Sequence, residues 1–166
     1  AIDFSRPEGQ ALVRRLAAGA DVLVENFKVG GLARHGLGYP DLAPEHPRLV
    51  YLSISAFGQS GPRSGEGGFD VTVQAMSGIM SVTGEPEGAP VKCGVPVSDV
   101  GTGLYAAFTI VSVLRRVAGG GAGAHIDASM LGCSLGMAAL QTSEFFGTGR
   151  DPKKLGSAHP RNAPYQ

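Results

Sequence analysis

Tryptophan is absent from this 166-residue sequence, cysteine occurs twice, and neither sign of charge is in excess. Lys and Arg together number 14, as do Asp and Glu, so the formal net charge is zero. Without a basic patch we expect no nucleic-acid partner. No apolar run reaches the ~18 residues of a membrane span, and no signal peptide is recognisable. We therefore expect a cytoplasmic protein without a membrane partner.

Cysteine and histidine show no metal-ligating pattern. Cys93 and Cys133 lie too far apart for a C-x-x-C motif, and the four histidines lack H-E-x-x-H spacing. We expect reduced, structural cysteines and no metal cofactor.

Glycine and proline, in contrast, are abundant. The chain has 26 glycines and 11 prolines, and 43% of its residues are hydrophobic. This composition predicts a globular domain with many turns. The sequence starts on Ala1 and stops at Gln166 without a closing element, which predicts a central fragment of a longer protein.

The order of patterns indicates an α/β fold. A strand tail at residues 1–4, a helix from Pro7 to Gly19 and an apolar strand at 21–24 form a βαβ unit, and 48–55 is the clearest strand. The sequence therefore predicts an open parallel sheet with flanking helices. The other expected elements are short helices at 32–35 and 41–45, a glycine-rich loop at 57–68, a helix at 70–77 capped by Asp70, a loop at 83–96, a strand at 125–128, and a helix at 129–146.

Residues 95–103, V-P-V-S-D-V-G-T-G, precede a long apolar helix at 104–117 that we expect to be buried. Ser98 and Asp99 are both suitable N-cap residues. Asp99 is therefore either a helix cap or a nucleophilic carboxylate, and local sequence leaves both open. A helix N-terminus is expected to keep Asp99 ionised.

Two weaker signals have alternative interpretations. Gly132–Gly136 matches the G-x-S-x-G nucleophile elbow of α/β-hydrolases around Ser134, with Asp151 and His159 in hydrolase order; small residues on a packed helix explain it as well. Asn26 and Phe27, at the carboxyl end of a strand, suit either a ligand site or an ordinary turn.

Nine motifs together resemble the family III CoA-transferases, the family of formyl-CoA transferase and carnitine CoA-transferase. They are I-D-F-S-R-P-E-G, A-D-V-L-V-E-N-F, L-A-R-H-G-L-G-Y, H-P-R-L-V-Y, S-A-F-G-Q-S-G-P, F-D-V-T-V-Q-A-M-S-G, T-G-E-P, P-V-S-D-V-G-T-G and A-H-P-R-N-A-P-Y-Q. Val29 and Ala124 depart from the family pattern, which usually has Pro and Gln there.

The resemblance implies a Rossmann-like large domain in an interlocked homodimer. Residues 1–146 would be part of this CoA-binding catalytic domain, and 147–166 a linker leading toward a second, smaller domain. Asp99 would be the catalytic carboxylate. The positions implied to contact coenzyme A are Ile2, Asp3, Asn26, Phe27, Lys28, Arg34, Gly67, Gly68, Phe69 and Asp70.

The activity implied is transfer of CoA from an acyl-CoA donor to a carboxylic acid through an aspartyl-CoA thioester on Asp99. Two alternatives stay open: a 2-methylacyl-CoA racemase-like enzyme of the same fold, and a non-catalytic CoA-binding or dimerisation fragment. In the racemases of this family a His precedes the Asp that matches Asp70; this chain has Phe69 there.

Overall fold

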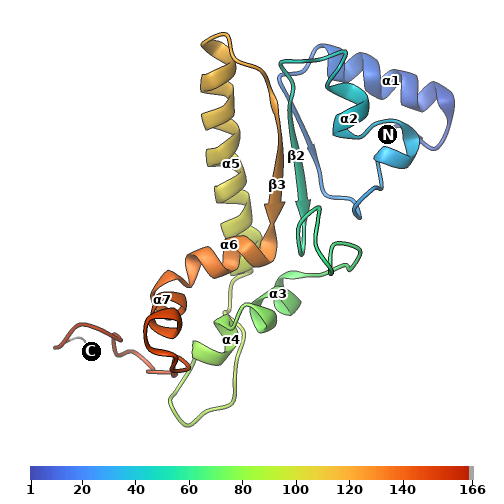
Figure 1. The fold of residues 1–166 in the computed structure, drawn as a ribbon. Helices are drawn as coiled ribbons and strands as arrows, with labels where there is room; N and C mark the ends of the chain where they lie inside the picture. Colours follow the sequence, from blue (N-terminus) through green and yellow to red (C-terminus); the bar gives the residue numbers. More distant parts are fainter. Residues whose placement is uncertain (165–166) are drawn as a thin grey trace.

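The computed structural model describes residues 1–164, so Tyr165 and Gln166, the end of the last motif, lie outside the described residues. Its centre is an open sheet of three parallel strands in the order β1 (Val22–Glu25), β2 (Val50–Ser55) and β3 (Ala124–Ser129). Strands β2 and β3 run downward in Figure 1, and β1 is parallel to β2, so the carboxyl ends of all three share one edge. The predicted parallel α/β fold is confirmed.

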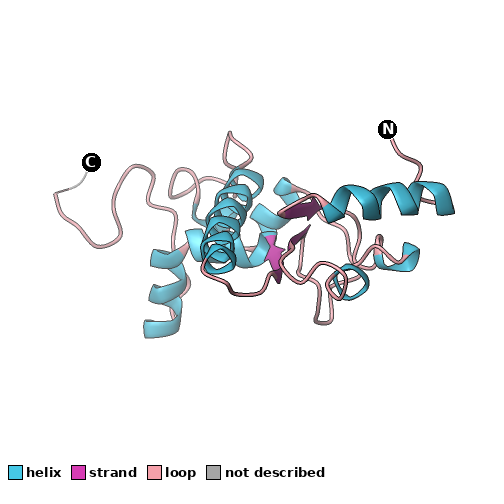
Figure 2. Cartoon of the chain, turned by 90° about the horizontal axis from the view of Figure 1, so that it is seen from above, coloured by secondary structure: helices cyan, strands magenta, loops and turns pink. Residues whose placement is uncertain are grey.

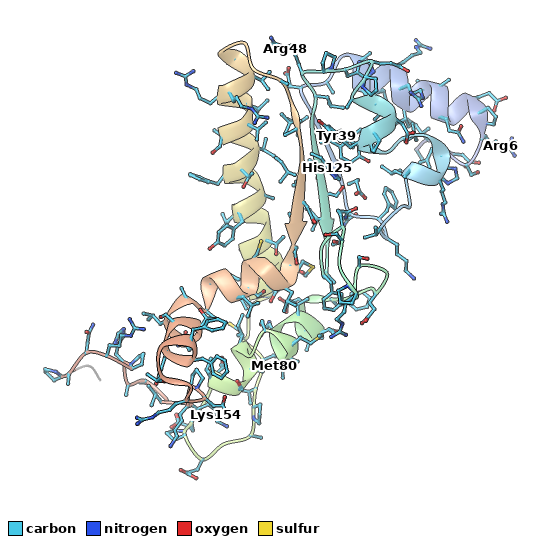
Figure 3. All side chains as sticks on the ribbon, viewed as in Figure 1. Arg6, Tyr39, Arg48, Met80, His125 and Lys154 are labelled. Carbon is cyan, nitrogen blue, oxygen red and sulfur yellow. The ribbon has the colours of Figure 1, made fainter. Side chains whose placement is uncertain are left out.

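Helices cover both faces of the sheet, as the view from above shows (Figure 2). Neighbouring residues of β2 point to opposite faces, as the strand pleat requires. Tyr51 packs with the N-terminal helices in one core cluster, whereas Val50 and Leu52 pack against the long helix α5 in another. On the first face His125 of β3 stacks on Tyr39, with ring centroids 5.2 Å apart (Figure 3).

The N-terminal segment differs from the expectation. Residues 1–4 form no strand; the Asp3 carboxylate instead accepts hydrogen bonds from the Ser5 amide at 3.1 Å and the Ser5 hydroxyl at 2.6 Å, which makes a turn. Helix α1 (Pro7–Ala18) then begins on its proline, as predicted.

The connection from β1 to β2 contains two short helical turns, η1 (Ala33–His35) and α2 (Tyr39–Leu42). The second begins two residues before the start that the sequence predicts. Pro40 is suited to a first helical turn, and the Gly38 amide donates to the Asp41 carboxylate at 2.9 Å.

Helix α5 (Val97–Ala118) starts earlier than the predicted apolar run and is less buried than expected. Leu104, Phe108 and Val111 are 68%, 76% and 65% exposed, and the helix packs on the sheet through Ala106 and Val117 instead. By length and composition α5 is also apolar enough to cross a membrane, although core helices of α/β folds meet the same criterion.

Four shorter helices gather beyond the carboxyl edge of the sheet (Figure 1). These are α3 (Asp70–Met76), α4 (Ile79–Val82), α6 (Met130–Met137) and α7 (Ala139–Thr148). The single helix expected at 129–146 is therefore two helices, because the backbone bends at Ala138, where ψ is 29°.

Beyond α7 the described chain, residues 149–164, is irregular and packs back on the domain. The Gly156 amide donates to the Gly84 carbonyl at 3.2 Å, and the Arg161 guanidinium donates to the Ser143 hydroxyl at 2.8 Å. The proposed boundary at residue 146 remains a prediction.

Candidate functional site

A cavity of about 690 Å³ opens at the carboxyl edge of the sheet. In open α/β sheets this edge is where ligands bind. Asp99 and seven of the ten residues expected to contact coenzyme A line this one cavity: Asn26, Phe27, Lys28, Gly67, Gly68, Phe69 and Asp70. Residues that come from the β1 loop, the glycine-rich loop, α3 and α5 are thus brought together from distant parts of the sequence.

The other three, Ile2, Asp3 and Arg34, do not line the cavity. Their sequence neighbours Phe4 and His35 belong to an aromatic cluster that includes Phe27 of the cavity wall. The Phe4 ring meets the rings of Phe27 and His35 edge-on, at centroid distances of 5.5 and 5.6 Å. Arg34 Nε lies 3.2 Å from His35 Nε2. The structure thus joins these three residues to the cavity only indirectly, through the ring of Phe4 against Phe27.

Asp99 lies in the first turn of α5, with an exposed side chain. Its carboxylate makes no hydrogen bond or ion pair within residues 1–164, so it is available to a ligand. Desolvation, and next the negative charge of Asp70, raise the pKa of Asp99 above its ordinary value. The sequence predicts that the helix end favours the ionised form of Asp99; the structure shows the opposite net effect, because burial and the charge of Asp70 favour the protonated form.

Asp70 occupies that helix end. Its Oδ1 accepts hydrogen bonds from the backbone amides of Ser98, at 2.9 Å, and Asp99, at 3.4 Å. The residue in the N-cap position of α5 is Pro96, and no side chain of that position caps the helix. Two expectations are thus corrected: neither Ser98 nor Asp99 caps α5, and Asp70 caps α5 and not its own helix, whose N-cap is Phe69.

Helix α6 packs tightly against the first turns of α5. Ser134 and Ser98 are fully buried, and the Ser134 hydroxyl donates to that of Ser98 at 2.9 Å. A Cβ placed on Gly101 would lie 2.2 Å from the Met137 sulfur, so the glycine lets α6 approach α5 closely. Because Ser134 is buried inside a helix, the G-x-S-x-G stretch is not a nucleophile elbow.

The glycine-rich loop forms one wall of the cavity and is anchored to the sheet. The Asp127 carboxylate of β3 accepts from the Gln59 amide at 2.8 Å, and Ser55 Oγ accepts from the Gly58 amide at 3.0 Å. Farther along, Arg63 and Glu66 pair at 2.6 Å. Sequence reasoning missed Asp127 and Glu66; the signal for Asp127 is a carboxylate near the end of a predicted strand.

Within residues 1–164 no three His, Cys, Asp or Glu side chains gather as a possible metal site. Cys93 and Cys133 are both free and half-buried. Burial raises the pKa of the Cys133 thiol, and a hydrogen bond with Thr102 opposes this.

Comparison with known proteins extends the resemblance to the whole chain. A succinate–glutarate CoA-transferase from Agrobacterium fabrum is 47% identical over 99% of the chain. The human succinyl-CoA:glutarate CoA-transferase is 36% identical over 100%, and an acetyl-CoA:oxalate CoA-transferase from Acetobacter aceti is 40% identical over 94%. The matches cover 41%, 38% and 40% of these relatives, so the chain spans about two fifths of their length.

Among solved structures, a CAIB/BAIF family protein from Brucella suis is 47% identical, with a TM-score of 0.91 over 99% of this chain and 44% of that one. The family model described as CoA-transferase family III matches residues 1–166. The chain therefore belongs to the family III CoA-transferases, which are enzymes.

Proposed function

We propose that the protein containing this chain moves CoA from an acyl-CoA donor to a carboxylate acceptor, with Asp99 as the covalent nucleophile. One observation carries the proposal. Asp99 presents an unpartnered carboxylate, within the part of the chain that the structure describes, to the cavity that seven expected CoA contacts line. A carboxylate needs no general base, unlike a serine hydroxyl, because its ordinary pKa lies near 3.9.

In the first half of the reaction, a carboxylate oxygen of Asp99 attacks the thioester carbonyl of the donor. The C–S bond breaks, CoA leaves as a thiolate, and a mixed anhydride remains on Asp99. The thiolate then attacks the aspartyl carbonyl. This step releases the donor as a free carboxylate and leaves an aspartyl-CoA thioester.

The second half repeats these steps in reverse order. The acceptor carboxylate attacks the aspartyl thioester, displacing the CoA thiolate and forming a second anhydride. The thiolate attacks the acceptor's acyl carbonyl, which yields the new acyl-CoA and regenerates Asp99. Asp99 is a weak nucleophile, so its reactivity must come from the position in which α5 holds it against the thioester.

The tetrahedral intermediates need hydrogen-bond donors for their oxyanions. The first-turn amides of Ser98 and Asp99 already donate to Asp70. We assign this role to backbone amides of Gly67 and Gly68, which line the cavity from the loop that faces α5. Lys28, on the β1 side of the cavity, supplies a positive charge for a phosphate or carboxylate of the substrates.

The acceptor we propose is a small dicarboxylate. The names of the relatives support this, since succinate, glutarate and oxalate all appear among them. We also propose a cytoplasmic, interlocked homodimer. The exposed apolar residues Leu104, Phe108 and Val111 of α5 support further burial of that face in the full-length protein.

The test is to incubate the full-length protein with succinyl-CoA and measure its intact mass. We expect the mass of one CoA, less one water, to be added, and hydroxylamine to convert the adduct to a hydroxamate at Asp99. Asp99→Ala should form no adduct and lose about 10⁴-fold or more in kcat with glutarate or oxalate as acceptor. An adduct on another residue, or substantial activity of Asp99→Ala, would contradict the assignment.

A further inference from the structure

The first turn of α5 has a cap supplied from another helix. The first amides of a helix have no partner within it and usually find one in the side chain of the N-cap residue. Pro96 occupies that position and has no side-chain acceptor. Asp70 Oδ1 meets the Ser98 and Asp99 amides instead, and one of these amides belongs to the proposed nucleophile itself.

Asp70 is itself held by a buried side chain one turn along α3. Gln74 is fully buried, and its Nε2 donates to Asp70 Oδ2 at 2.6 Å. The side-chain oxygen Oε1 of Gln74 accepts from the backbone amide of Cys93 at 2.8 Å, on the loop that leads into α5. Both oxygens of Asp70 are therefore engaged by the protein, and the orientation of Gln74 is fixed from both ends.

We propose that Asp70, held by Gln74, is a positioning residue that fixes Asp99 at the start of α5 and acts on the reaction through Asp99. This inference rests on the proposed function. This role explains why Asp70 lies at the cavity wall although both of its carboxylate oxygens accept hydrogen bonds from the protein. A shift of the reacting carboxylate by about 1 Å costs on the order of 100-fold in rate, which is the scale of effect such a cap controls.

The charge of Asp70 gives the proposal a second readout. This charge is the second cause, after desolvation, of the raised pKa of Asp99. Removing the charge therefore lowers the pKa of Asp99. The other charged groups lining the cavity are Lys28 and Glu66, and Glu66 is paired with Arg63. The titratable residues of the other elements packed on α5 are Cys133 of α6, His125 and Asp127 of β3, and Tyr51 of β2.

The chain offers a matched exchange. In Asp70→Asn the side-chain NH₂ of the new Asn faces the side-chain NH₂ of Gln74, so two donors meet. The Asn side-chain oxygen still accepts from the backbone amides of α5. Combining it with Gln74→Glu restores a donor–acceptor pair and keeps an acceptor for the Cys93 amide. The double variant therefore keeps the cap and moves the negative charge one turn away from Asp99.

The experiment measures kcat and KM for succinyl-CoA against pH in the full-length wild type, Asp70→Asn, Gln74→Glu and the double variant. We expect kcat to fall by about tenfold to 100-fold in each single variant, with KM nearly unchanged, and to recover to within about threefold in the double variant. The acid limb of kcat/KM should move to lower pH in Asp70→Asn and in the double variant.

Two outcomes would overturn the inference: an unchanged kcat and acid limb in Asp70→Asn, or a loss confined to KM, which would make Asp70 a substrate contact. The CoA adduct on the wild type is measured in the same preparations. Absence of that adduct overturns the proposed function, and this inference with it. An adduct at Asp99 together with an unaltered Asp70→Asn enzyme overturns this inference alone.

Discussion

The hydroxyl of Ser134 donates a hydrogen bond to the hydroxyl of Ser98, across 2.9 Å and out of contact with solvent. This bond joins α6 to the first turn of α5, directly next to Asp99. Its two residues are 36 positions apart in the sequence, and one of them lies in the stretch that matches a hydrolase elbow. A motif that resembles a hydrolase nucleophile elbow thus helps to fix α5, the helix that carries the proposed nucleophile Asp99.

Ser134→Ala in the full-length protein should therefore reduce stability and leave the chemistry largely intact. The Ser98 hydroxyl loses its buried partner, which costs about 1–3 kcal/mol of unfolding free energy. Denaturant unfolding measures this loss, and the transferase assay should show kcat within about threefold of wild type, since Ser134 touches no substrate.

Ser112→Ala is the matched control for that variant. Ser112 is an exposed serine of α5 whose hydroxyl bonds back to the Phe108 carbonyl, so its loss should change stability by less than about 0.5 kcal/mol. A Ser134→Ala protein that folds normally and is inactive would contradict a purely structural role for Ser134.

The electrostatics of Asp99 predict how stability depends on pH. Because its pKa is raised in the folded state, the folded protein holds this proton more tightly than the unfolded chain. The stability that this group contributes is fully present below the ordinary Asp pKa and is lost as pH rises through the raised value. Asp99→Asn should therefore be more stable than wild type at neutral pH.

The measurement for this prediction is thermal unfolding of wild type and Asp99→Asn between pH 3 and pH 7. The difference in Tm should shrink steadily as the pH falls, because the protonated Asp99 carboxyl and the amide of the variant are then both uncharged. Asp151→Asn, a change at an exposed carboxylate outside the cavity, is the control. A difference that grows on acidification would contradict the raised pKa.

The sequence predicts the strands and the edge of the sheet at which the cavity lies better than it predicts individual side-chain contacts. Short apolar runs bounded by turn residues locate all three strands. Parallel strands bring their carboxyl ends to one edge, so the meeting of Asn26 with Asp99 in one cavity follows from topology. The cap on α5 could not be predicted, because it depends on tertiary contact between Asp70 and an amide 28 residues away.

The predicted burial of α5 was wrong for a related reason. Periodicity shows that a helix has an apolar stripe, but not which neighbour covers it. Here Ala106 and Val117 meet the sheet, while Phe108 is 76% exposed in a chain that spans about two fifths of its relatives. The strand expected at residues 1–4 failed because Asp3 and Ser5 close a local turn.

The last prediction separates a transferase from a racemase of the same fold. Racemisation of a 2-methylacyl-CoA needs a proton-accepting group on each face of the α-carbon. Phe69 stands where the resemblance places a histidine in the racemases; it lines the cavity and is 79% exposed. A phenyl ring cannot accept a proton, so one of the two required bases is missing from that position.

We therefore expect the full-length protein to exchange no α-hydrogen of 2-methylacyl-CoA in deuterated water when a carboxylate acceptor is absent. Mass spectrometry of the recovered thioester measures the exchange, and Phe69→His is the informative variant, because it supplies an imidazole at the matching position. Asp99 alone suits acyl transfer, because one carboxylate attacks the donor thioester and is regenerated at the end of the cycle without removing a proton from the α-carbon. Exchange by the wild type at the rate of its turnover would show that Asp99 works with a second base, and the transferase assignment would then be wrong.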